Sequence, residues 1–252
     1  MTDPTAEAPS VDLPAPERVL VVVAHPDDAE FQAGATLAKW ARQGTELHHL
    51  VLTDGSKGTW DPAVDTAALV RRRQEEQRSA AAVLGGSQVH FLGRVDGALD
   101  SDRQTRAEVC AVIRLVRPTV VMGHDPWKRY RLHPDHRAAG QLVVEGLVAA
   151  RDPFFHPEQL DGGLAPHRPD ALLLFEADEV THYEVVDEED LAVKLGALEA
   201  HRSQMETTHF YKVGDGDPLE AFRAGQRSRL ATSGAAIGVP LAESFHLIAD
   251  QL

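Results

Sequence analysis

The sequence predicts an α/β fold built on a doubly wound, mostly parallel sheet with helices on both faces. Two observations predict it. Residues 19–24 form an unbroken apolar run rich in β-branched side chains, which is too short for a helix and typical of a strand buried on both faces. Strand-like and helix-like patterns then alternate along the chain, which indicates right-handed βαβ crossovers in a Rossmann-like arrangement.

Four predicted strands are each followed by a predicted helix in the first 150 residues. The strands are 19–24, 46–53, 88–92 and 119–122. The helices run from near Glu30 to Gly44, over 66–85, from a capping box at Ser101 and Gln104 to the residues before Pro118, and over 134–150. Glycine after a helix and proline at a first helical position mark several of these ends.

The rest of the chain is less regular. Residues 152–169 hold four prolines and a glycine pair, so we expect a long loop or an insertion there. Residues 171–175 and 182–186 are typical of strands, and a helix is expected from Leu191 to His201. Beyond His201 the pattern predicts no element, although residues 17–252 are expected to form a single domain.

Composition excludes several classes of protein. Among the 252 residues, 43% are hydrophobic and 25% are charged, as in an ordinary globular protein. The net charge of −14 disfavours nucleic acid and anionic membranes as partners. No apolar run approaches the ~20 residues of a membrane span. The first 16 residues contain four prolines and lack the features of a signal peptide, so we expect a disordered leader and a cytoplasmic protein.

The single cysteine, Cys110, excludes an internal disulfide and a metal site built from several thiolates. It lies within an apolar helical pattern. We therefore expect a buried, unreactive thiol.

Two clusters of ionisable side chains follow predicted strands. Residues 25–28 come directly after the first strand, and residues 133–136 follow the fourth. Open α/β sheets bind their ligands at the C-terminal ends of strands. His25, Asp28 and His136 offer two imidazoles and one carboxylate, which is a typical set of three protein ligands for catalytic zinc.

Other residues of the two clusters suit the proton transfers of a hydrolysis. Zinc lowers the pKa of a bound water from 15.7 to about 7. Asp27 is a carboxylate beside the metal that can take the proton of this water. His133, one helical turn before His136, can protonate an amine leaving group, and Asp135 can hold one imidazole in the required tautomer.

Three other interpretations are compatible with the same residues. An isolated histidine or aspartate at a helix start is commonly a cap or a partner of the helix dipole. Two histidines and one carboxylate also form the facial triad of non-haem iron oxygenases. A catalytically silent binding module could keep zinc for structure alone, although such a site has no need of Asp27 and His133.

Two motifs have a specific spacing: residues 24–30 (AHPDDAE) and residues 133–136 (HPDH). Together they resemble the LmbE-like, or PIG-L, family of zinc-dependent N-deacetylases, whose members include mycothiol and bacillithiol biosynthesis deacetylases and mycothiol conjugate amidase. Weaker matches are Thr53-Asp54-Gly55, the helix with Arg73, Glu76, Ala80, Leu84 and Gly85, then Phe91-Leu92-Gly93 with Asp96-Gly97, residues 201–204 and residues 243–245. The resemblance covers about residues 17–245 and implies a single LmbE-like domain.

The resemblance implies a role for each site residue. It assigns the metal to His25, Asp28 and His136, with Zn²⁺ expected and Fe²⁺ an alternative in the cell. It assigns catalysis to Asp27 as general base and to His133 as general acid and oxyanion partner, supported by Asp135. The mycothiol and bacillithiol relatives imply that Arg73, Asp96 and Gln204 contact the sugar-bearing substrate.

The implied activity is hydrolysis of an N-acyl amide, mainly acetyl, on a glucosamine-containing small molecule. An amidase acting on thiol conjugates of a related sugar is the alternative. No nucleic acid or membrane insertion is expected, and a homo-oligomer is compatible with the sequence. Some relatives carry a tyrosine two residues before the first histidine of the second motif, where this chain has Arg131 next to Tyr130.

Overall fold

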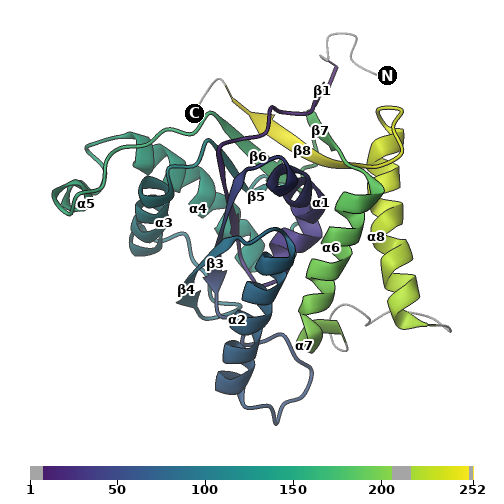
Figure 1. Ribbon diagram of the computed structural model, residues 1–252. Coiled ribbons are helices and arrows are strands. Elements are labelled where there is room, and N and C mark those ends of the chain that lie inside the picture. Colours follow the sequence, from purple (N-terminus) through teal and green to yellow (C-terminus); the bar gives the residue numbers. More distant parts are fainter. Residues whose placement is uncertain (1–7, 206–216, 250–251) are drawn as a thin grey trace.

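The structure is a computed structural model that describes residues 8–205, 217–249 and 252, and within these residues eight strands form one central sheet (Figure 1). The strands are β1 (Ser10–Val11), β2 (Arg18–Val23), β3 (Glu46–Thr53), β4 (Gln88–Arg94), β5 (Val120–His124), β6 (Ala171–Phe175), β7 (His182–Val185) and β8 (Ala242–Ile248). Their order across the sheet is β1-β7-β8-β6-β5-β2-β3-β4.

The chain winds outward from the middle of this sheet in two directions. It passes from β2 to β3 and β4 on one side, and then returns to the other side of β2 through β5 and β6, all in parallel. Only β8 is antiparallel to its neighbours, β6 and β7. The predicted doubly wound, mostly parallel sheet is therefore confirmed.

Helices cover both faces of the sheet. α1 (Asp28–Arg42), α2 (Thr66–Val83) and α6 (Glu188–Ala200) pack together over one face, and α3 (Arg103–Val116) packs on α4 (Pro134–Arg151) over the other. The remaining helices of the described part of the chain are α5 (Pro157–Asp161), α7 (Arg202–Gln204) and α8 (Pro218–Ala235). Among the described residues, no helix has the length and apolar character needed to cross a bilayer.

The central strand β2 explains the unbroken apolar run in the sequence. Val19, Val21 and Val23 pack in the core under α1, whereas Leu20 and Val22 pack in the core under α3 and α4. All five side chains are fully buried. A strand with helices on both faces needs apolar residues at every position, because neither face meets water.

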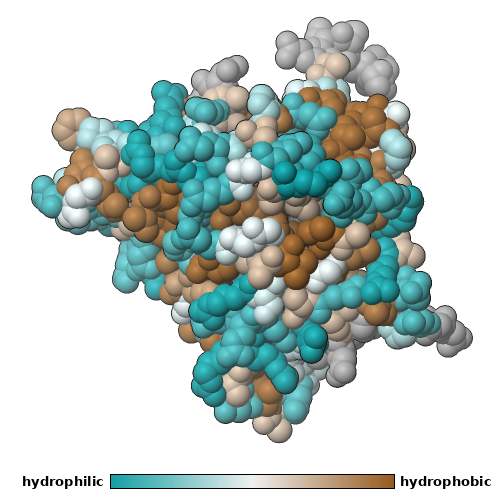
Figure 2. Space-filling view, viewed as in Figure 1, coloured by the Kyte–Doolittle hydropathy of each residue, from teal (hydrophilic) through white to brown (hydrophobic). Residues whose placement is uncertain are grey.

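Helix α2 carries polar side chains on its inner face as well as its outer face. Its outer residues, which include Arg71, Arg72 and Glu75, are exposed, and hydrophilic side chains cover much of this part of the surface in Figure 2. Arg73 and Gln77 are nevertheless buried, at 3% and 0% exposure. These two side chains point toward the turn that follows β2.

Two sequence predictions about helix starts are corrected. Helix α1 begins at Asp28, before the predicted Glu30. The cap of α3 is Asp102, whose carboxylate accepts the backbone N–H of Thr105, while the Ser101 hydroxyl donates to Glu145 on α4. Asp102 is the cap because its carboxylate reaches the N–H of Thr105, in the first turn of the helix, where N–H groups have no partner within the helix.

The predicted disordered leader, residues 1–16, is also corrected in part. Ser10–Val11 form β1, which pairs with β7, and the Asp12 carboxylate accepts a hydrogen bond from Lys39 at 2.8 Å. Residues 8–16 are therefore placed against the sheet, and residues 1–7 lie outside the described residues. The segment 152–169 is a connection that contains only the short helix α5.

Candidate active site

The sheet has a topological switch point between β2 and β5. These strands are neighbours, but the chain leaves them toward opposite sides of the sheet. The loops after such strands separate and leave a crevice in which α/β proteins bind ligands. His25 follows β2 and His124 ends β5, so the two ionisable clusters meet at this crevice.

Local sequence sets how each helix begins beside the crevice. Asp27, the N-cap of α1, has φ of 93°, a left-handed conformation that costs a non-glycine residue about 1–3 kcal/mol. The Asp28 carboxylate accepts the backbone N–H of His25 at 2.8 Å. Helix α4 begins at Pro134, where a proline loses no helical hydrogen bond, so His133 is its N-cap.

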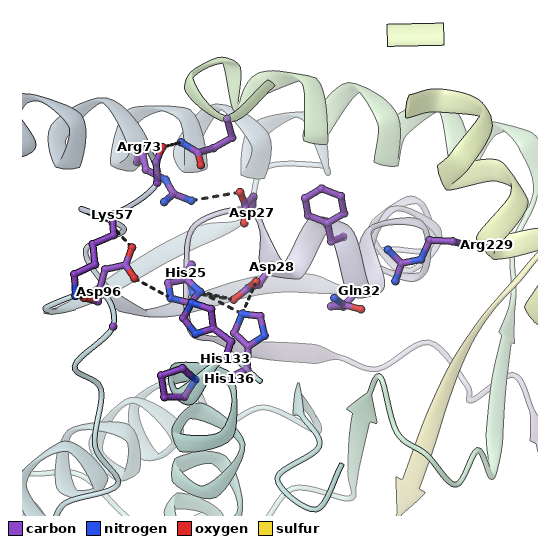
Figure 3. A pocket seen from close by; sticks show the side chains of 15 residues that line it. His25, Asp27, Asp28, Gln32, Lys57, Arg73, Asp96, His133, His136 and Arg229 are labelled. Carbon is purple, nitrogen blue, oxygen red and sulfur yellow. Dashed lines mark hydrogen bonds and ion pairs between the residues drawn. The ribbon is translucent and has the colours of Figure 1, made fainter. Parts of the chain in front are cut away.

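His25, Asp28 and His136 converge as predicted (Figure 3). His25 Nδ1 lies 3.3 Å from His136 Nε2. Asp28 places Oδ2 at 3.4 Å from His25 Nδ1 and Oδ1 at 3.3 Å from His136 Nε2. Donor atoms of a tetrahedral site with bonds of about 2.0–2.1 Å are about 3.3–3.4 Å apart. These residues therefore have the chemistry and the spacing to hold a metal ion such as zinc.

Two further carboxylates fix the orientation of the His25 ring. His25 Nε2 lies 3.1 Å from Asp135 Oδ2 and 3.3 Å from Asp96 Oδ1. An N–H at Nε2 leaves the lone pair of Nδ1 directed at His136 and Asp28, which is the tautomer a metal ligand needs. Burial alone would lower the pKa of His25, but its hydrogen bonds to Asp135, Asp28 and Asp96 raise it well above the usual range. The surroundings of His25 therefore favour positive charge.

Asp135 contacts one imidazole, as the residues alone allowed, but this is His25 and not the His133 that the resemblance implied. Its carboxylate binds His25 and accepts the backbone N–H groups of Gly97 and Leu99 at 2.6 and 3.2 Å. Burial opposes ionisation of Asp135, yet these hydrogen bonds lower its pKa to about 2. The reason is the helical position: Asp135 lies in the first turn of α4 and faces His25 and the loop after β4.

His124 is a site residue that was not among the predicted ligands. Its side chain is fully buried, its Nε2 lies 3.3 Å from Asp28 Oδ2, and its ring stacks on His136 with centroids 4.2 Å apart. Asp28, His124 and His136 also form one of the groups of donors close enough to share an ion within the described residues. One feature could have identified His124 as a site residue: it is the last residue of a buried strand, β5, beside the switch point.

Asp27 lies on the opposite side of His25 and Asp28 from His133 and His136 (Figure 3). Its Oδ2 is 3.3 Å from Arg73 Nη2, and its backbone N–H donates to Gln77 Oε1 at 3.0 Å. Arg73 also donates to the carbonyls of Pro26 and Gly55, at 2.7 and 2.9 Å. The buried guanidinium therefore ties the Asp27 turn to the loop after β3.

His133 lies at the edge of the cluster. Its ring centroid is 4.6 Å from that of His25 and 4.8 Å from that of His136. Partial burial lowers the pKa of His133, and the neighbouring His25 and His136 lower it further. The surroundings of His133 therefore favour the neutral imidazole.

A pocket of about 470 Å³ opens above the candidate ligands, within the volume range of small-molecule sites. Its lining includes all three residues predicted to contact substrate, Arg73, Asp96 and Gln204. Gln204 is 1% exposed and donates to the carbonyl of Gly58 at 3.0 Å. Lys57 and Arg229, which the sequence did not single out, also line the pocket.

Residues 20–147 match the family described as PIG-L: GlcNAc-PI de-N-acetylase. The chain belongs to the PIG-L family. It is 39% identical over 189 residues to the diacetylchitobiose deacetylase of Thermococcus kodakarensis, covering 75% of this chain and 70% of that protein. It is 33% identical to a 1D-myo-inositol 2-acetamido-2-deoxy-alpha-D-glucopyranoside deacetylase of Streptomyces avermitilis, covering 58% of this chain and 58% of that protein.

A solved structure is similar over almost the whole chain. The N,N'-diacetylchitobiose deacetylase of Pyrococcus horikoshii, complexed with its inhibitor MPG, has a TM-score of 0.83 and 29% identity. The similarity covers 93% of this chain and 84% of that one. The expected resemblance to the PIG-L family and its fold are both confirmed.

The chain departs from some PIG-L relatives where they carry a tyrosine. Arg131 holds that position and is 7% exposed, with an ion pair to Glu176 and a hydrogen bond to the carbonyl of Asp125 at 3.3 Å. The adjacent Tyr130 is 84% exposed. Arg131 NH1 lies 3.5 Å from His124 Nδ1, so this arginine contacts the side of His124 that faces away from Asp28.

Proposed function

We propose that this protein is a metal-dependent N-deacetylase that hydrolyses the acetamide of an N-acetylglucosamine unit in a small molecule. One observation carries the proposal: His25 Nδ1, His136 Nε2 and the two oxygens of the Asp28 carboxylate meet at the spacing of a tetrahedral metal site, inside a pocket that Asp27 and His133 also line. The relatives support the substrate class, because the names of both curated proteins describe deacetylases of N-acetylglucosamine compounds.

The residues of the pocket have different roles in the reaction. A bound Zn²⁺ would polarise the amide carbonyl and lower the pKa of a water molecule to about 7. Asp27 takes a proton from this water as its oxygen bonds to the carbonyl carbon, and Arg73 keeps the Asp27 carboxylate in place. His133 gives a proton to the amide nitrogen as the carbon–nitrogen bond breaks, so that acetate and a free amine leave.

The walls of the pocket support a sugar substrate. Arg73, Asp96 and Gln204 present a cation, a carboxylate and an amide to the same space, and such groups bind hydroxyls by hydrogen bonds. The volume of about 470 Å³ suits one or two sugar rings. We propose an N-acetylglucosamine disaccharide or an inositol-linked N-acetylglucosamine as the substrate, with Zn²⁺ as the metal.

The test is release of primary amine from a panel of compounds by the zinc-loaded protein. The panel contains diacetylchitobiose, an inositol-linked N-acetylglucosamine, N-acetylglucosamine and an S-alkylated thiol conjugate of a glucosaminide. We expect equimolar amine and acetate from at least one of the first three compounds. Cleavage of the thiol conjugate alone would replace the proposal with the amidase alternative.

Two controls test the role of Asp27 and the class of reaction. Asp27→Asn keeps the shape of the side chain but removes the base, so we expect kcat to fall by about 10²–10⁴-fold while bound zinc stays at the parental level. Anaerobic assay distinguishes hydrolysis, which needs no oxygen, from an oxygenase reaction. Full activity of the Asn variant, or activity that requires oxygen, would contradict the mechanism.

A further inference from the structure

The turn that carries Asp27 is held at its main chain as well as at its side chain. Asp27 has φ of 93°, in the left-handed region that residues with a side chain rarely adopt. The Asp27 side chain makes no capping hydrogen bond to α1. The backbone N–H of Asp27 instead donates to Gln77 Oε1 at 3.0 Å.

The orientation of the Gln77 amide is fixed from both ends. The N–H of Asp27 can only donate, so the Gln77 oxygen must face it and the amide nitrogen must face away. That nitrogen donates to Glu30 Oε1 at 2.7 Å. Gln77 therefore has one possible arrangement, with both ends of its amide satisfied.

Glu30 lies between two buried histidines. Glu30 Oε2 lies 3.5 Å from His201 Nε2, and Glu30 Oε1 lies 3.7 Å from His49 Nε2. Glu30, Gln77, His49 and His201 are all 0% exposed. This buried polar cluster lies under the start of α1 and reaches the candidate active site through the amide of Gln77.

The position of Gln77 on α2 pairs it with Arg73. The two residues are one helical turn apart and therefore share a face of the helix. Arg73 binds the Asp27 carboxylate and Gln77 binds the Asp27 N–H. Gln77 does not line the pocket, so it has no direct contact with a ligand there.

We propose that Gln77 is a positioning residue for the reaction: its hydrogen bond holds Asp27 in the left-handed conformation that directs the carboxylate into the pocket. The proposal rests on the proposed function, in which Asp27 is the general base. A buried amide needs partners to offset its loss of hydration, and an apolar side chain would fill the same space without that cost. The hydrogen bond between the Asp27 N–H and Gln77 therefore explains why Gln77, a polar residue, is buried beside Glu30.

The first test measures the hydrogen bond itself. In the full-length, zinc-loaded protein, ¹³C-carbonyl proline combined with ¹⁵N-aspartate labels only the amides of Asp27, Asp135 and Asp170, because only these aspartates follow a proline. In Gln77→Met we expect the Asp27 amide to exchange with solvent at least about 10-fold faster than in the parent. The Asp170 amide, which donates to Thr119, is the internal reference and should not change.

The second test measures catalysis in the same variant. A misplaced base lowers kcat and leaves substrate binding intact, so we expect kcat to fall by about 10–100-fold, KM to stay within about threefold, and bound zinc to match the parent. The matched control is Gln226→Met, which removes another buried glutamine, on α8. If Gln77→Met does not fold, Gln77→Ala leaves room for water and is measured instead.

The outcomes separate this inference from the proposed function. Unchanged exchange of the Asp27 amide, or faster exchange with unchanged kcat, would overturn the role of Gln77. A rise in KM alone would also overturn it. A parent protein that releases no amine from any compound would overturn the proposed function, while the exchange experiment would still test the hydrogen bond between Gln77 and Asp27.

Discussion

His136 Nε2 lies 3.3 Å from His25 Nδ1, although the two residues are 111 positions apart in the sequence. The contact exists because β2 and β5 are neighbours in the sheet, so the loops that follow them open into one crevice. The Nε2 atom of His25 faces Asp135 and Asp96, which leaves its Nδ1 lone pair directed at His136. Two nitrogen lone pairs this close repel each other unless a proton or a metal ion lies between them.

Added Zn²⁺ should therefore stabilise the fold through these residues. At a free concentration 100 times Kd, a ligand that binds only the native state adds about 2.7 kcal/mol to the free energy of unfolding. Urea unfolding of the chelator-treated protein, with and without Zn²⁺, measures this increment. His136→Ala should abolish most of it, whereas His90→Ala, which changes a histidine stacked on His48, should retain it. Equal increments in both variants would exclude His136 as a ligand.

Arg73→Lys distinguishes two roles for Arg73. The structure ties the guanidinium to Asp27, Pro26 and Gly55, and a lysine ammonium cannot reproduce this planar set of bonds. We expect kcat to fall by about 10–100-fold with KM within about threefold, because the base is displaced. Steady-state kinetics measures both kcat and KM, and Arg72→Lys, on the outer face of α2, is the control. A higher KM with unchanged kcat would indicate that Arg73 acts on the substrate alone.

Glu176 should stabilise the protein in a pH-dependent way. Burial opposes its ionisation, but its bonds to His124 and Arg131 lower its pKa from 4.5 to about 2. Because the folded pKa is depressed, the stabilisation is complete above about pH 4.5 and is lost as the pH falls toward 2. It amounts to at most about 3 kcal/mol.

Urea unfolding between pH 3 and pH 7 checks the contribution of Glu176. Glu176→Gln should be less stable than the parent at pH 7, and the difference should shrink at pH 3. Glu179→Gln changes an exposed carboxylate nearby and should show little difference at either pH. If the free energies of unfolding of the parent and Glu176→Gln differ by the same amount at pH 3 and pH 7, the pH-dependent contribution of Glu176 is contradicted.

Cys110 should react slowly in the native protein. Burial raises the pKa of its thiol from 9.0 to about 11, although the nearby Arg114 acts in the opposite direction. At pH 8 the thiolate fraction falls by about 100-fold, and burial also restricts access. A chromogenic disulfide reagent should label the folded protein at most one-hundredth as fast as the urea-unfolded protein. Equal rates would show that the thiol is accessible in the native state.

Local sequence was sufficient for the first half of the fold. The apolar run at β2 and the glycine and proline positions at helix ends are short-range signals, so the four leading strands and their helices could be predicted. The start of α3 was misplaced by one residue because Ser101 and Asp102 are both good caps, and the contact of Ser101 with Glu145 on α4 decides between them. β8 and α8 were not predicted, because β8 is recognisable mainly by its pairing with β6 and β7.

The sequence by itself determined the parallel sheet and the two ionisable clusters, because burial on both faces of β2 and the starts of α1 and α4 depend on residues close together in the chain. Only the tertiary structure decided the partners within the crevice: Asp135 binds His25 and not His133, His124 supports Asp28, and Gln77 holds the Asp27 N–H. The physical reason is that hydrogen bonds between segments depend on where side chains of different helices and strands meet, and no spacing along the chain encodes that distance.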